Sequence, residues 1–138
     1  MNCALACIDP RNAPTYWPLA EKLISAAACK QNLSDFAALT NDVLHGRALL
    51  WLVGDIDQHY RIRAAVVTQI IGSNANKYCT IVACGGEGRR DWLPLLGQIE
   101  DYAKREGCAA MRIYGRRGWA RVLPDYKIIG HITERALT

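Results

Sequence analysis

The stretch that decides the fold is residues 78–107, with the sequence YCTIVACGGEGRRDWLPLLGQIEDYAKREG. It opens with a short apolar run of the kind found in buried strands, and three glycines within four residues then mark a tight turn. The rest carries apolar residues at helical spacing, with Asp91 as the expected N-cap, Pro94 in the first turn and Gly107 as the stop. The pattern predicts a strand, a glycine loop and an amphipathic helix in direct succession.

The segments on either side of this unit alternate between strand and helix periods. They predict the order β-α-α-β-β-β-α-β-α-β, hence an α/β fold with a mixed, mostly antiparallel sheet and helices on both faces. The length of 138 residues fits one domain over residues 1–138. The predicted elements are a strand at 3–8, helices from Thr15 and from Ser34 to Gly46, strands at 48–53, 60–71 and 78–83, the helix just described, a strand at 110–114, a helix at 117–123 and a strand at 126–133.

The composition is that of an ordinary globular protein, with 51% hydrophobic and 22% charged residues. No apolar run reaches the roughly 18 residues that a membrane span needs. The first residues lack the basic and apolar regions of a signal peptide, so we expect the chain to stay in the cytoplasm where it is made.

Six cysteines and three histidines raise the question of a disulfide framework or a metal site. The cysteines form no Cys-x-x-Cys pair, and the histidines show no ligand-like spacing to them. We therefore expect small buried side chains in a reducing compartment, and no metal site. The residues concerned are Cys3, Cys7, Cys29, Cys79, Cys84, Cys108, His45, His59 and His131.

Positive charge is concentrated in the second part of the chain. Residues 1–60 carry four Lys/Arg against six Asp/Glu, and residues 61–138 carry thirteen against seven. Such a face can contact nucleic acid or an acidic partner, or it can simply be solvated, and we favour solvation. The basic group consists of Arg89, Arg90, Lys104, Arg105, Arg112, Arg116, Arg117 and Arg121.

The element order and the segment from Cys79 to Tyr126 resemble the GNAT superfamily of N-acetyltransferases. The run from Trp92 to Tyr126 looks like small GNAT-like proteins of tailed phages and prophages, some of which are internal virion proteins. This resemblance implies a non-catalytic virion component near the portal or tail, located in the host cytoplasm and then in the virion. Its implied partners are other virion proteins, further copies of the chain, and packaged DNA through non-specific contacts.

In active members of that superfamily, an Arg/Gln-x-x-Gly-x-Gly/Ala loop holds the diphosphate of coenzyme A. The resemblance assigns this role to Gly85, Gly86, Gly88, Arg89 and Arg90. Glu87 replaces the usual basic residue, and Gly88 is kept. Arg90 then stands in place of the next glycine, and Trp92 in place of the third small residue. A negative charge and a large ring both oppose a diphosphate, although Arg89 and Arg90 offer it side-chain contacts.

The resemblance also implies a tyrosine that protonates the leaving thiolate, and Pro124 stands in its place. No general base is evident, because Asp55, Asp57 and His59 have the pattern of ordinary turn residues. We therefore expect no catalytic residue and no cofactor. The alternative is an acetyl-coenzyme A-dependent N-acetyltransferase that acts on an amine of a small molecule or host protein.

Overall fold

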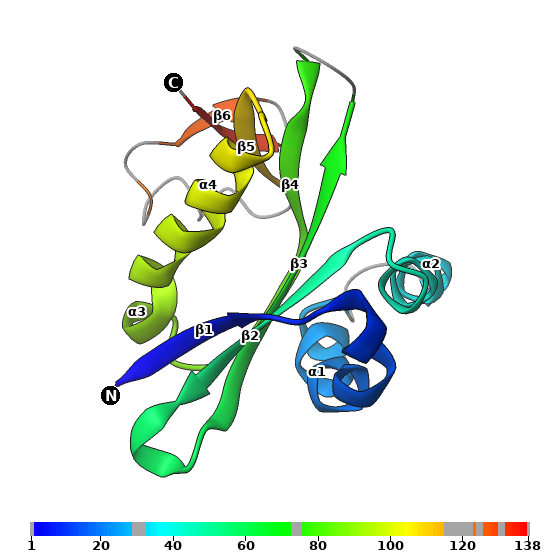
Figure 1. The fold of residues 1–138 in the computed structure, drawn as a ribbon, viewed down its shortest axis with the longest axis vertical. Coiled ribbons are helices and arrows are strands. Elements are labelled where there is room, and N and C mark those ends of the chain that lie inside the picture. Colours follow the sequence, from blue (N-terminus) through cyan, green and yellow to red (C-terminus); the bar gives the residue numbers. More distant parts are fainter. Residues whose placement is uncertain are drawn as a thin grey trace. The chain divides into compact units, whose positions relative to one another are not determined.

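The computed structural model describes residues 2–28, 33–72, 76–114, 123, 126–129 and 132–137. It divides into two compact units (Figure 1). The first unit consists of Met1–Thr68 and Ala83–Leu96, and the second of Gln69–Val82 and Gly97–Thr138.

Three antiparallel strands form the sheet of the first unit. They are β1 (Cys3–Cys7), β2 (Leu49–Asp55) and β3 (Arg61–Ile71), with β2 in the middle. Successive residues of a strand point to opposite faces, and every residue of β2 from Leu50 onward is buried, so both faces of this strand are covered. The continuous apolar run of β2 in the sequence predicts this, and the prediction is confirmed.

Two helices, α1 (Ala13–Ala28) and α2 (Leu33–Leu44), complete the first unit beside this sheet (Figure 1). The sequence leaves Trp17 as either an exposed interface anchor or a core residue, with the core favoured. Trp17 is 4% exposed and its ring stacks on Phe36 at 6.2 Å, so the core position is confirmed. α1 starts before the expected cap at Thr15, because a short turn at Pro10–Asn12, capped by the Asp9 carboxylate, leads directly into it.

The predicted helix after the glycine loop is divided in the structure. β4 (Tyr78–Gly86) is followed by the short α3 (Arg89–Trp92), a 3₁₀ turn at Leu93–Leu95 and α4 (Leu96–Arg105). Pro94 explains the division, because it has no N–H to donate and its ring crowds the preceding turn. Asp91 lies within α3, so its prediction as the N-cap is wrong.

The second unit adds a parallel strand and an antiparallel hairpin. β5 (Ala110–Tyr114) pairs in parallel with the first half of β4, as a strand–helix–strand connection requires. β6 (Lys127–Ile129) and β7 (Ile132–Ala136) pair with each other, and β7 also pairs with β5. The prediction of one strand over 126–133 is wrong, because Ile129 lies opposite Ile132 and the chain reverses between them.

The strands of the described residues follow the order β1-β2-β3-β4-β5-β7-β6, with parallel and antiparallel neighbours. The predicted α/β class with a mixed, mostly antiparallel sheet is confirmed. The predicted helix at 117–123 lies outside the described residues, apart from Leu123.

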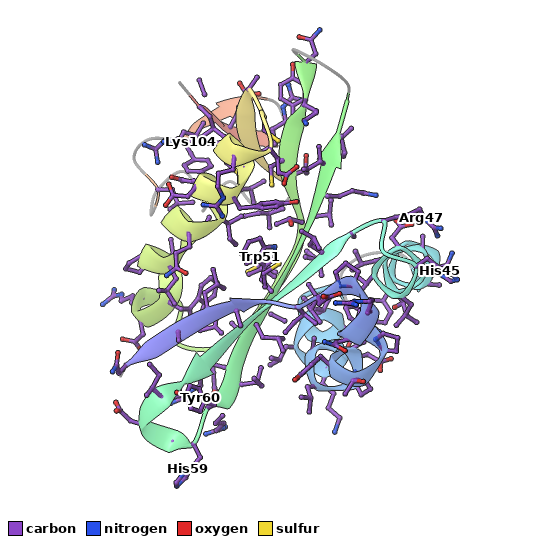
Figure 2. The ribbon with its side chains drawn as sticks, in the orientation of Figure 1. His45, Arg47, Trp51, His59, Tyr60 and Lys104 are labelled. Carbon is purple, nitrogen blue, oxygen red and sulfur yellow. The ribbon has the colours of Figure 1, made fainter. Side chains whose placement is uncertain are left out.

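Tryptophan and cysteine side chains test the predicted core. Their apolar surroundings in the sequence predict that Trp51 (labelled in Figure 2) and Trp92 lie in the core, and both are buried. The Trp51 indole donates to the Thr68 hydroxyl at 2.9 Å. Cys79 and Cys108 are also buried, and Cys3 and Cys84 are partly buried. Cys7 is exposed near the end of the edge strand β1, so its predicted burial is wrong. Trp119 and Cys29 lie outside the described residues.

Candidate functional site

The candidate site is the glycine loop, residues 85–90, which joins β4 to α3 in the first unit. Gly85 is buried at the end of β4, whereas Gly86 and Gly88 are exposed. Both exposed glycines have positive φ angles, 149° for Gly86 and 68° for Gly88. Residues with a Cβ adopt such angles only with strain, so the local turn requires both glycines.

Gly86 has a packing role that the sequence does not reveal. A Cβ on Gly86 would lie 2.5 Å from Cα of Ala64 and 2.5 Å from the Arg63 carbonyl oxygen. The N–H of Glu87 donates to the same carbonyl at 3.0 Å. The end of β4 is therefore held tightly against β3, and the loop starts from a fixed backbone position.

A β-bulge places Arg63 beside the loop. Val53 pairs with Ala64 and Gly54 pairs with Ile62, so Arg63 is the extra residue of β3. A bulge redirects the side chain of its extra residue, and only 14% of the Arg63 side chain is exposed. The alternation of the strand at 60–71 predicts Arg61 and Arg63 on its outer face. This is wrong for Arg63, whereas Arg61 is exposed as predicted.

The carboxylate of Asp55 holds Arg63 from one side. Nε and Nη2 of Arg63 donate to Oδ2 of Asp55 at 3.3 and 3.2 Å. The other oxygen of Asp55 accepts from the N–H of Asp57 at 3.1 Å, which confirms the predicted turn chemistry of Asp55. The burial of Asp55, which is 1% exposed, and its ion pair were not predicted.

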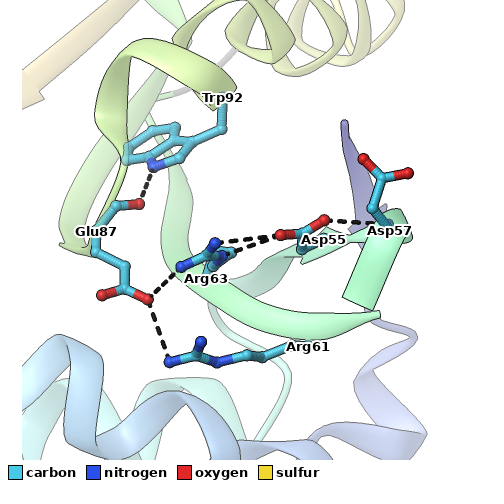
Figure 3. A network of polar contacts seen from close by, with 6 residues as sticks. All are labelled: Asp55, Asp57, Arg61, Arg63, Glu87 and Trp92. Carbon is cyan, nitrogen blue, oxygen red and sulfur yellow. Dashed lines mark hydrogen bonds and ion pairs between the residues drawn. The ribbon is translucent and has the colours of Figure 1, made fainter. Parts of the chain in front are cut away.

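Glu87 extends this arrangement to the surface (Figure 3). Nη1 of Arg63 donates to Oε1 of Glu87 at 2.6 Å, and Nη2 of Arg61 lies 3.4 Å from the same oxygen. The hydrogen bond from Arg63, with the positive charges of Arg63 and Arg61, lowers the pKa of Glu87. We call Asp55, Arg61, Arg63 and Glu87 the Glu87 clamp; its two positive and two negative side chains balance.

Trp92 is buried and binds the backbone of the glycine loop through its indole N–H. The indole N–H donates to the Glu87 carbonyl at 3.0 Å, and the residue is 4% exposed (Figure 3). The N–H of Asp91 donates to the Gly88 carbonyl at 2.9 Å and closes the turn. The large ring expected to crowd a bound diphosphate is therefore buried on the inner side of the loop.

Of the predicted cofactor-binding residues, the structure brings Gly85, Gly86, Gly88 and Arg90 together in one loop, with Arg90 exposed in α3. The Arg89 side chain lies outside the described part. Sequence reasoning missed Arg61 and Arg63, because 24 residues separate Arg63 from Glu87 and no local pattern signals the contact.

A second polar cluster lies in the second unit and includes Tyr126, the tyrosine two residues after Pro124. The Tyr126 hydroxyl donates to Oε2 of Glu100 at 2.7 Å, and Nη1 of Arg135 donates to Oε1 of Glu100 at 2.5 Å. Burial and the hydrogen bond to Glu100 raise the pKa of Tyr126 well above its ordinary value. Tyr126 is thus a core residue whose hydroxyl is bound by Glu100. Pro124 lies outside the described residues.

The basic group is only partly available to a partner. Arg112 pairs with Glu134 at 2.8 Å and lies 3.7 Å from the centre of the Tyr78 ring, so its charge is used within the second unit. Lys104 and Arg105 are exposed at the end of α4 (Lys104 is labelled in Figure 2). Arg116, Arg117 and Arg121 lie outside the described residues.

Two further predictions concern metal and membrane. Among the described residues, no group of three or more His, Cys, Asp or Glu side chains is placed to hold a metal ion. Within the same residues, no helix combines the length and the apolar character that crossing a membrane would require.

No protein-family model matches the chain, and no protein of curated function matches its sequence. Solved structures do match. A GNAT family acetyltransferase from Brucella melitensis in complex with acetyl-CoA has a TM-score of 0.70 at 10% identity, covering 99% of this chain and 89% of its own.

Two further structures match over nearly the whole of both chains. One chain of the NatC complex bound to Gag peptide and CoA has a TM-score of 0.69 at 13% identity, covering 100% of both chains. Aminoglycoside 6'-acetyltransferase type Ii has a TM-score of 0.69 at 11% identity, covering 98% of this chain and 97% of its own. The chain therefore has the GNAT acetyltransferase fold, and the comparisons show no link to phage proteins.

Proposed function

We propose that the chain is an acetyl-coenzyme A-dependent N-acetyltransferase that acts on an amine of a small molecule or a protein. The observation that carries this proposal is the state of the glycine loop. The Glu87 carboxylate is neutralised by two guanidinium groups, and the Trp92 ring is buried on the inner side of the loop. The charge of Glu87 and the ring of Trp92 therefore oppose a bound diphosphate much less than the sequence alone suggests.

The loop residues fit a diphosphate chemically. Gly88 is exposed with a φ angle of 68° and presents no side chain, so a ligand can approach its backbone. Arg90 is exposed two residues further on, in α3, and offers a guanidinium to phosphate oxygens. In this proposal Gly88, Arg89 and Arg90 hold the diphosphate, and Gly85 and Gly86 set the turn that presents them.

Bound acetyl-coenzyme A supplies an acetyl group on a thioester, which a neutral amine can attack. Neither Asp55 nor Tyr126 assists this transfer, because Asp55 is held by Arg63 and Tyr126 by Glu100. A thiol has a pKa of about 8.5, so the thiolate is an adequate leaving group without a strong acid. The amine loses its proton to water in this scheme, and the rate should rise about tenfold per pH unit below the pKa of the amine.

The test is release of free thiol from acetyl-coenzyme A in the presence of amine acceptors. Peptides with free N-termini and aminoglycosides are suitable acceptors, because acetyltransferases of this fold have been solved with a peptide bound and with aminoglycoside activity. We expect turnover that falls about a hundredfold in Gly88→Trp, because the ring would cover the loop backbone. Gly97→Ala is the control, since a Cβ there meets nothing within 4 Å. Absence of thiol release with every acceptor would refute catalysis.

A second candidate is a non-catalytic virion component that keeps the fold without turnover. It is favoured by the internal use of the loop's polar groups, since Glu87 and Asp91 donate their N–H groups within the unit. Its partners would be other virion proteins, further copies of the chain or packaged DNA. Mass spectrometry of purified phage particles tests it, and detection only in cell lysate would count against it.

A further inference from the structure

Arg61 and Arg63 converge on a single oxygen atom. Oε1 of Glu87 lies 2.6 Å from Nη1 of Arg63 and 3.4 Å from Nη2 of Arg61, so one anionic oxygen bridges two guanidinium groups. Guanidinium groups arranged in this way are typical of phosphate and carboxylate recognition. The arrangement has the geometry of a small anion site, and a side chain of the protein itself is its occupant.

The Arg63 guanidinium keeps its place without Glu87. Nε and Nη2 of Arg63 are bound by the buried Asp55, which leaves Nη1 directed at Glu87 (Figure 3). The bulge at Arg63 fixes the backbone from which this side chain extends. Nη1 is therefore preorganised for an anion, whichever anion occupies the position.

The carboxylate of Glu87 is the member of the clamp that can leave. The Glu87 side chain is 55% exposed, whereas that of Asp55 is 2% exposed. The backbone of Glu87 is fixed at both ends, because its N–H donates to Arg63 and its carbonyl accepts from Trp92. Rotation of the side chain into solvent thus releases the carboxylate without moving the loop, and exposed ion pairs of this kind hold weakly.

We propose that Arg61 and Arg63 form an anion-binding site in which Glu87 is an internal, exchangeable occupant, and that a phosphate group of a ligand displaces it. A dianionic phosphate competes with a monoanionic carboxylate for the same two guanidinium groups. Glu87 therefore excludes monoanions that bind arginine no more strongly than a carboxylate does. The source of the phosphate is either coenzyme A, which rests on the proposed function, or free inorganic phosphate and pyrophosphate.

The experiment is calorimetric titration of the full chain with inorganic pyrophosphate at low salt. Glu87→Gln removes the competing charge, and we expect its affinity to rise about tenfold or more above that of the unchanged chain. The gain should disappear in Glu87→Gln combined with Arg61→Gln. Glu21→Gln, on the exposed face of α1, is the matched control for loss of one negative charge and should bind like the unchanged chain.

Two results would overturn the anion site: Glu87→Gln binds pyrophosphate no better than the unchanged chain, or Glu21→Gln gains as much. If Glu87→Gln does not fold, Glu87→Asp retracts the carboxylate by one methylene group and should give a smaller gain in the same direction. Titration with coenzyme A separates the two proposals. If Glu87→Gln binds pyrophosphate more tightly than the unchanged chain but neither protein binds coenzyme A, the anion site is supported and the proposed function is refuted. If both proteins bind coenzyme A equally and Glu87→Gln gains no affinity for pyrophosphate, the proposed function is supported and the anion site is refuted.

Discussion

Two glutamates of this protein bind arginine in opposite surroundings. The Glu87 side chain lies on the loop of the first unit and is 55% exposed, whereas that of Glu100 lies on α4 in the second unit and is 11% exposed. Glu87 offers one oxygen to two arginines. Glu100 uses one oxygen for Arg135 and the other for the Tyr126 hydroxyl.

The difference in exposure assigns the two clusters different roles. Losing a partner from a buried ion pair leaves a charge uncompensated in a medium of low polarity, so the Glu100 cluster is fixed and structural. An exposed pair exchanges its contacts with water at little cost, so the Glu87 clamp can exchange its contacts with a ligand. We therefore expect Glu100 to contribute mainly to stability and Glu87 to the proposed anion binding.

The largest effect should follow removal of the buried carboxylate. Glu100→Ala removes the acceptor of the buried Tyr126 hydroxyl and one partner of Arg135, and we expect it to lower the free energy of unfolding by about 2–3 kcal/mol. Urea unfolding measures this change. Asp101→Ala, at the exposed neighbouring position, is the control and should change stability little. A loss at Glu100 no larger than that at Asp101 would remove the contrast on which the comparison rests.

An intermediate effect should follow from Gly86→Ala, which tests whether the close packing of β4 against β3 fixes the backbone at the start of the glycine loop. The new Cβ would lie 2.5 Å from Cα of Ala64, so β3 and β4 must separate. We expect a loss of about 2 kcal/mol in the free energy of unfolding, together with weaker pyrophosphate binding. Gly97→Ala serves again as the control. An unchanged unfolding curve for Gly86→Ala would show that the close approach of the two strands does not constrain the loop.

The smallest effect is a pH dependence at Glu87. Its pKa in the folded chain is lower than in the unfolded chain, because the Arg63 hydrogen bond favours the charged form. The stabilisation is therefore fully present above the ordinary value of 4.5 and is lost as the pH falls through the lowered pKa.

The urea midpoints of the unchanged chain and of Glu87→Gln measure this dependence. Their difference should be small at neutral pH and should vanish in acid. A difference between the two midpoints that grows as the pH falls would contradict the lowered pKa of Glu87 and its ion pairs with Arg61 and Arg63.

The strands were the part of the fold most accessible from sequence. The apolar run of β2 and the flanking glycines and turn residues fix its bounds to within about two residues, because burial on both faces leaves a local signature. The break in the helix at Pro94 and the hairpin at Ile129 and Ile132 were missed. The apolar residues keep helical spacing on both sides of Pro94, so this spacing alone does not show the break there. Gly130 and His131 interrupt the apolar run between Ile129 and Ile132, but they do not by themselves fix where the second strand starts.

The candidate site was predictable only in its local part. The glycines of the loop stand out because positive φ angles demand them, as at Gly88. The partners of Glu87 could not be predicted, because Arg63 contacts it through a bulge that depends on the register of β2 against β3. Without those partners, the sequence makes Glu87 look repulsive to phosphate, whereas the structure surrounds it with positive charge.

Calorimetric titration with acetyl-coenzyme A, for the unchanged chain and for Gly88→Trp, tests most directly whether the glycine loop binds the cofactor. We expect micromolar binding to the unchanged chain and its loss in the variant, whose ring would cover the loop backbone. No heat of binding to the unchanged chain at millimolar ligand would contradict it, and so would equal affinity in the two proteins.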